Sequence, residues 1–177
     1  RRSPNGIEIS RTGAEVLIVG NLATASLVDP EREAHQWAES QMKRISATGR
    51  NEPIVVLGVG SGFHLRALQA LMARSEAPLT KSPIVAIDSC SESIRFAASR
   101  TANVTFIRAD LADGVDAFFE SPQVRAWIAQ KYTLLRHKPT VTRAGDSLRE
   151  VESWLVGRSP FAFSAHLKLR PQIAAAL

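Results

Sequence analysis

The chain has 177 residues, a length sufficient for one domain with its own buried core. Apolar residues make up 45% and charged residues 22%, which is typical of a globular protein and excludes a fibrous or low-complexity chain. The net charge of +5 favours anionic partners mildly and also fits an ordinary solvated surface, while the scattered basic residues and the 6% of aromatic residues disfavour nucleic acid.

The sequence predicts neither a membrane segment nor a metal site. No apolar run approaches the roughly 20 residues that span a bilayer, and we expect no leader peptide. The single cysteine, Cys90, cannot form an internal disulfide, and the four histidines do not combine with it in a zinc-ligand spacing. We therefore expect a cytoplasmic protein in which Cys90 packs as a free thiol.

The first residues predict a small β element followed by a helix. Two β-type runs flank Gly13 within residues 7–20, a pattern typical of a hairpin. Asp29 can then cap a helix and Pro30 can begin it. Apolar residues follow at helical spacing, namely Ala34, Trp37, Ala38 and Ile45.

From residue 54 the pattern alternates between strands and helices. The predicted strands cover residues 54–57, 84–87 and 104–107, and a helical pattern follows each. Short apolar strands separated by amphipathic helices predict an α/β fold, with a Rossmann-like, methyltransferase-like parallel sheet and helices on both faces. In this sheet we expect the strand at 54–57 to be central and to lie beside the strand at 84–87. We expect residues 1–50 to form the N-terminal hairpin and helix, and residues 51–177 the Rossmann-like domain.

Beyond Asp110 the pattern is mainly helical. Helices are expected to open at Ser121 and at Asp146. Residues 132–135 and 140–142 are interpreted as two further strands. The last residues, 159–177, are interpreted as a closing segment or the start of a linker.

A glycine-rich loop is the sharpest functional signal. Gly58, Gly60 and Gly62 join an apolar strand to a helix, where free N–H groups and the positive end of the helix favour a polar or anionic ligand. The third glycine of a dinucleotide fingerprint would fall at Phe63, which disfavours a dehydrogenase. The spacing is closer to the cofactor loop of class I S-adenosylmethionine-dependent methyltransferases. The alternative is a tight turn that binds nothing.

Three further residues are candidates for the same site. Asp88 ends the second strand, where an acid can bind ribose hydroxyls, and Asp110 follows the third, near where an adenine amino group would lie. His64 opens the helix after the loop and could donate to a ligand. The alternative is structural: both acids cap helices and His64 packs. Ser89 and Glu92 are expected to form a capping box.

Two departures weaken the methyltransferase hypothesis. Val56 stands where an acid commonly precedes the first glycine, and no catalytic motif follows Asp110. The basic residues 136–138 and Arg143 could hold phosphates, but we interpret them as a solvated basic surface.

The segment from Asn21 to Ala34, with its Asp29-Pro30-Glu31 start, and the loop at residues 55–65 together resemble the N-terminal part of the motility accessory factor (Maf) proteins of bacterial flagellin glycosylation. That group includes proteins similar to 6-hydroxymethylpterin diphosphokinase. The resemblance implies a Rossmann-like module for a nucleotide-type ligand, followed by a transferase domain as its partner. The ligand or cofactor would be a nucleotide or S-adenosylmethionine. The alternatives are a small-molecule methyltransferase and a domain that makes only protein contacts.

Overall fold

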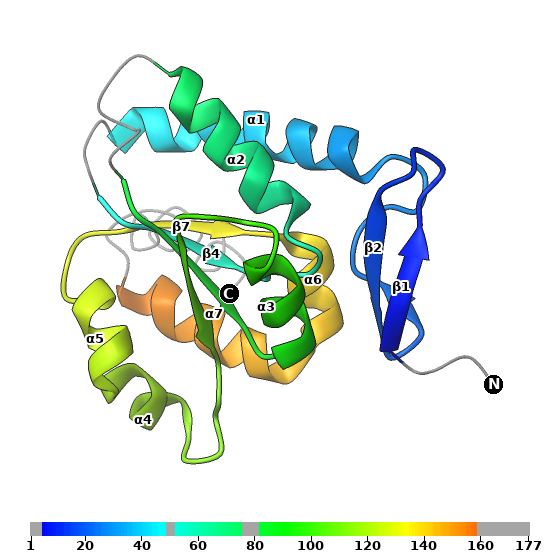
Figure 1. Ribbon diagram of the computed structural model, residues 1–177. Coiled ribbons are helices and arrows are strands. Elements are labelled where there is room, and N and C mark those ends of the chain that lie inside the picture. The colour runs from blue at the N-terminus through cyan, green and yellow to red at the C-terminus, as the bar shows by residue number, and fades with distance from the viewer. Residues whose placement is uncertain (1–4, 49–51, 76–81, 159–177) are drawn as a thin grey trace, which may run out of the picture.

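The computed structural model describes residues 5–48, 52–75 and 82–158 (Figure 1). The first element is a small antiparallel sheet of three strands, β1 (Asn5–Ile9), β2 (Glu15–Val19) and β3 (Leu22–Ala23), in that order. The predicted hairpin is therefore confirmed, and β3 adds to it. Gly20 and Asn21 form the two-residue turn between β2 and β3, and both have positive φ angles, as tight hairpin turns require.

The main sheet is parallel and has four strands, β4 (Ile54–Leu57), β5 (Ile84–Asp88), β6 (Val104–Arg108) and β7 (Thr133–Arg136). The spatial order is β6-β5-β4-β7, so the prediction that β4 is central and lies beside β5 is confirmed. The chain winds outward from β4 through β5 to β6, and then returns to place β7 on the other side. The junction of β4 and β7 is thus a topological switch point, the place where ligands bind in open α/β sheets.

Helices cover both faces of this sheet (Figure 1). They are α1 (Pro30–Thr48), α2 (Phe63–Arg74), α3 (Ser91–Ala98), α4 (Val115–Glu120), α5 (Pro122–Ile128), α6 (Lys138–Ala144) and α7 (Asp146–Arg158). Alternate residues of β4 point to opposite faces: Val56 joins a buried cluster with α1 and α2, and Leu57 joins one with α4 to α7. This arrangement explains why β4 is apolar at every position.

Two local predictions are wrong. Residues 140–142, expected as a strand, lie in α6, whose first turn contains a proline and whose Thr140 and Val141 are buried. The capping box does not form either, because the N-cap of α3 is Cys90 and makes no side-chain cap bond. Its backbone N–H instead donates to Asp88 Oδ1. The segment expected to close the chain, 159–177, lies outside the described residues.

Hydrogen bonds attach the small sheet to the glycine loop that follows β4. The Leu17 backbone N–H donates to Ser61 Oγ over 3.0 Å, and the Thr24 hydroxyl donates to the Leu17 carbonyl oxygen over 2.9 Å. The Thr24 and Ser61 hydroxyl oxygens lie 2.5 Å apart. The small sheet consequently stands at the carboxyl ends of the parallel strands (Figure 1). Among the helices in the described ranges, none is long and apolar enough to cross a bilayer.

Candidate functional site

The glycine loop has the backbone geometry that its composition predicts. Gly58, Gly60 and Gly62 have φ angles of +90°, +51° and +77°, a region that other residues rarely adopt. The loop turns the chain sharply from the end of β4 into α2, whose N-cap is Gly62.

Neighbouring parts of the chain lie against each of these glycines. A Cβ atom at Gly58 would lie 2.8 Å from Thr140 Cβ, and one at Gly60 would lie 2.9 Å from the Thr24 carbonyl oxygen. Packing against the chain itself is therefore sufficient to explain why the loop needs glycine, and the segments that contain Thr24 and Thr140 occupy space above it.

The buried carboxylate of Asp88 holds the glycine loop through hydrogen bonds to its backbone. It is only 1% exposed, and its Oδ2 accepts hydrogen bonds from the backbone N–H groups of Val59, at 2.7 Å, and Gly60, at 3.3 Å. Its Oδ1 accepts one from the Cys90 N–H at 2.9 Å. Burial raises the pKa of Asp88, and the backbone hydrogen bonds oppose this by stabilising the charged form. The carboxylate thus fixes the ends of β4 and β5 together.

His64 points into the interior. It is 3% exposed, its Nε2 lies 2.9 Å from the Gly58 carbonyl oxygen, and its ring stacks on that of His137 with centroids 3.8 Å apart. Trp37 meets both imidazoles edge-on. Burial lowers the pKa of His64 well below its usual value and that of His137 to about 4. We name Trp37, His64 and His137 the aromatic cluster; it joins α1, α2 and the start of α6.

Asp110 lies apart from the other candidates. It is exposed, and its Oδ1 accepts a hydrogen bond from the Ala112 backbone N–H at 3.2 Å. It does not line the cavity that reaches Asp88. The structure therefore brings Asp88 and the glycine loop into contact and places Asp110 elsewhere.

A cavity of about 260 Å³ lies beside Asp88, at the carboxyl ends of the strands. We name it the Asp88 cavity. Its walls come from the small sheet, from the start of α3 and from α6, and include Leu22, Thr24, Asp88, Cys90, Ser93, Thr140, Arg143 and Ala144. It therefore lies between the end of β5 and the helix that follows β7, across the switch point. The thiol of Cys90 donates to Glu92 Oε2 at 3.4 Å.

Arg143 is one of the cavity residues whose position the sequence does not predict. Together with residues 136–138 it is expected on a solvated surface, yet Arg143 is half-buried and His137 is 7% exposed. The Arg143 Nη1 atom is buried and has no hydrogen-bond partner. Burial lowers the pKa of Arg143, and the negative charges of Asp88 and Glu33 oppose that shift. The only sequence signal was the cationic residue itself.

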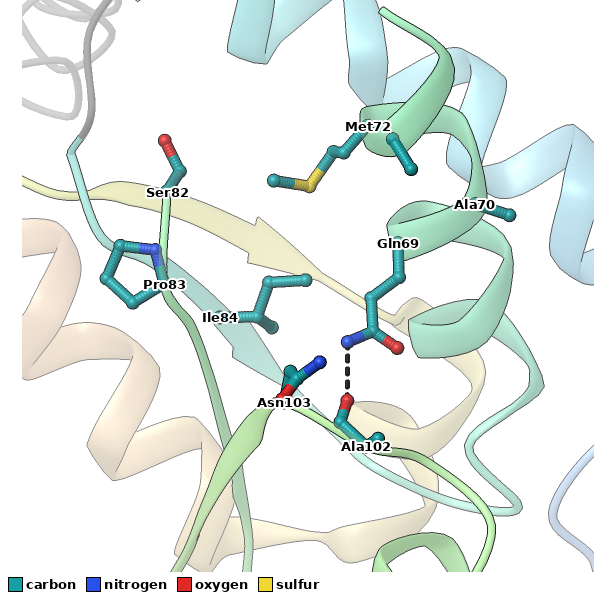
Figure 2. Close-up of a pocket in the computed structure, with 9 residues that line it drawn as sticks. Gln69, Ala70, Met72, Ser82, Pro83, Ile84, Ala102 and Asn103 are labelled. Atoms are coloured by element: carbon teal, nitrogen blue, oxygen red, sulfur yellow. Dashed lines mark hydrogen bonds between the residues drawn. The ribbon is translucent and has the colours of Figure 1, made fainter. Parts of the chain in front are cut away.

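A second recess of about 600 Å³ lies at the opposite, amino-terminal edge of the sheet (Figure 2). Figure 2 shows Met72 and Gln69 of α2 facing Ile84 and Asn103, and Gln69 donates to the Ala102 carbonyl oxygen at 2.6 Å. None of the described residues that line it has an ionisable side chain. These residues offer apolar contacts and hydrogen bonds from the amides of Gln69 and Asn103 and the hydroxyl of Ser82.

The described residues contain no group of three His, Cys, Asp or Glu side chains that could hold a metal ion. Comparison of the chain with protein-family models, with curated proteins and with solved structures gives no match. The geometry of the site is consequently the basis for its function.

Proposed function

We propose that this chain is a Rossmann-like binding domain for a nucleoside-type ligand, which it holds in the Asp88 cavity. The observation that carries the proposal is the position of that cavity: it opens at the switch point of a parallel sheet, beside a strand-end acid. In this proposal the glycine loop is hydrogen-bonded to Asp88 and does not itself form the ligand-binding surface.

Asp88 retains capacity to bind a ligand hydroxyl. A carboxylate has about four lone-pair sites. The backbone N–H groups of Val59, Gly60 and Cys90 donate to Asp88, and that of Ser89 also stabilises its charge. The Gly60 bond is long, at 3.3 Å, and Asp88 lines the cavity, so a donor from the cavity side can share the carboxylate. A sugar hydroxyl is such a donor, and the buried charge would make this hydrogen bond stronger than a neutral one.

The cavity volume limits how much of the ligand is enclosed. Small-molecule pockets usually hold about 300–1,000 Å³, and this cavity holds about 260 Å³. It suits a sugar with its substituent, while the base would lie at the rim, where Leu22 is 55% exposed and offers an apolar surface. The resemblance to Maf proteins favours the same ligand class.

We do not propose methyl transfer. A cofactor that lay against the glycine loop would meet Thr24 and Thr140, which already pack against Gly58 and Gly60. The candidate base beside the loop, His64, is buried, and its Nε2 is hydrogen-bonded to the Gly58 carbonyl oxygen. We expect no transfer from labelled S-adenosylmethionine to small-molecule or lysate acceptors, and turnover that disappears in Gly60→Ala would favour the methyltransferase alternative.

The test fills the cavity without removing a hydrogen bond. Ala144 lines the cavity, and Ala144→Leu adds volume there, whereas Ala126→Leu adds the same atoms at an exposed position of α5. Calorimetric titration with nucleosides, nucleotides and S-adenosylhomocysteine should detect binding to the wild type at millimolar concentration or below. We expect Ala144→Leu to weaken it at least about tenfold, the loss of one good contact, and Ala126→Leu to leave it unchanged. Absence of all binding to the wild type would refute the proposal.

A further inference from the structure

Arg143 brings an unsatisfied positive charge to the Asp88 cavity. A guanidinium has five N–H donors in a planar fork, and a buried donor without an acceptor is costly. Arg143 lines the cavity, and its Nη1 is buried without a partner. Within the described ranges, no ion pair joins it to a carboxylate. A bound group in the cavity can accept from the part of the half-buried guanidinium that lines it, while Nη1, which is closed to solvent, reaches such an acceptor only if the side chain reorients.

The nearby carboxylates are engaged elsewhere. Asp88 directs both of its oxygens to backbone N–H groups of the glycine loop and of Cys90. Glu33 Oε2 accepts a hydrogen bond from the Ser26 backbone N–H at 3.0 Å. These charges lie near enough to favour the charged form of Arg143, but neither forms an ion pair with it. The guanidinium is thus held charged and left available.

We propose that Arg143 binds the phosphate of the ligand, so that the domain selects nucleotides over nucleosides. This inference rests on the proposed function and specifies its ligand class. A phosphate presents paired oxygens that match the guanidinium fork, and such charge-assisted pairs are stronger than neutral hydrogen bonds. Asp88 would then receive a sugar hydroxyl and Arg143 the anionic end, so opposite charges in the cavity orient the nucleotide.

The experiment compares matched ligands and matched variants. Adenosine, guanosine, cytidine and uridine are each titrated calorimetrically beside their 5′-monophosphates, because the base is unidentified. For at least one pair, the wild type should bind the monophosphate about tenfold or more tightly than the nucleoside, as charged hydrogen bonds of about 1.5–3 kcal/mol imply. Arg143→Gln should abolish that preference by weakening monophosphate binding more than nucleoside binding, and Arg143→Lys should restore part of it. Arg149→Gln, at an exposed arginine of α7, is the control.

The outcomes separate the two proposals. Equal binding of nucleosides and monophosphates, or a preference that survives in Arg143→Gln, overturns the phosphate inference and leaves the binding domain in place. No binding of either class to the wild type overturns the proposed function and with it this inference. Thermal unfolding shows whether each variant folds. If Arg143→Gln does not fold, Arg143→Lys is compared with the wild type instead, and it should show a smaller preference for the monophosphate.

Discussion

The aromatic cluster predicts that this protein loses stability in mild acid. His137 is buried, and its pKa is lowered from 6.5 to about 4. In the unfolded chain it would bind a proton as the pH falls below 6.5, while in the folded chain it stays neutral until about pH 4. Its contribution to stability is therefore complete above pH 6.5 and decreases as the pH falls from 6.5 to about 4. His64, whose pKa is also lowered by burial, changes stability in the same direction.

The expected magnitude follows from the two pKa values of His137. Between pH 7 and pH 5 this one residue should reduce the free energy of unfolding by about 2 kcal/mol. Urea unfolding followed by tryptophan fluorescence suits the measurement, because Trp37 contacts both imidazoles. His137→Gln removes the titrating group, so its unfolding free energy should change less between the two pH values than that of the wild type.

The control is His35→Gln, on α1, where the histidine is about half exposed and pairs with Glu39. It should retain the pH dependence that His137 supplies, because it leaves the aromatic cluster unchanged. If His137→Gln and the wild type lose equal stability between pH 7 and pH 5, the reasoning is refuted, whatever the stability of the variant at pH 7.

Two further predictions concern the glycine loop. Gly58→Ala should lower the free energy of unfolding by about 2–4 kcal/mol, because Gly58 has a positive φ and an added Cβ would lie 2.8 Å from Thr140. The control, Gly13→Ala, has a similar φ of +86° but open space around it, so it should lose only the free energy that the positive φ costs. Equal losses in urea melts would show that the Thr140 contact is unimportant. Asp88→Asn replaces a carboxylate oxygen by an NH₂ group that faces backbone N–H donors, so it should lower the free energy of unfolding by about 2–3 kcal/mol. The control, Asp110→Asn, affects one exposed hydrogen bond and should lower it far less. An Asp88→Asn variant as stable as the wild type would contradict the role of Asp88 in holding the loop.

The parallel strands are predictable because each is a short apolar run. Residues 54–57, 84–87 and 104–107 match β4, β5 and β6 to within a residue, and the strand expected at 132–135 is β7, one residue later. Such runs have few alternatives when both faces must be buried. The strand predicted at 140–142 is wrong. Two threonines and a valine favour a strand locally, but a proline in the first turn and the burial of Thr140 and Val141 stabilise a helix there.

The candidate site is predictable only in its local part. The glycines and Asp88 lie where a strand–turn–helix pattern predicts them. Thr24 and Arg143 belong to the same site, but they come from a hairpin before β4 and a helix after β7. No spacing in the sequence connects residues so far apart, and an arginine in a basic stretch has the same local pattern whether it is solvated or lines a cavity.

The strand order also bears on how the chain is synthesised. Ile54 of β4 pairs with Ile84 on one side and with Thr133 on the other. On the ribosome β5 follows β4 soon, but β7 comes only after residues 58–132, which takes roughly 4–15 seconds at about 5–20 residues per second. During that time one edge of a wholly apolar strand has no partner, and such edges promote association between nascent chains. The exposed edge of β4 is therefore open to such association until β7 has emerged.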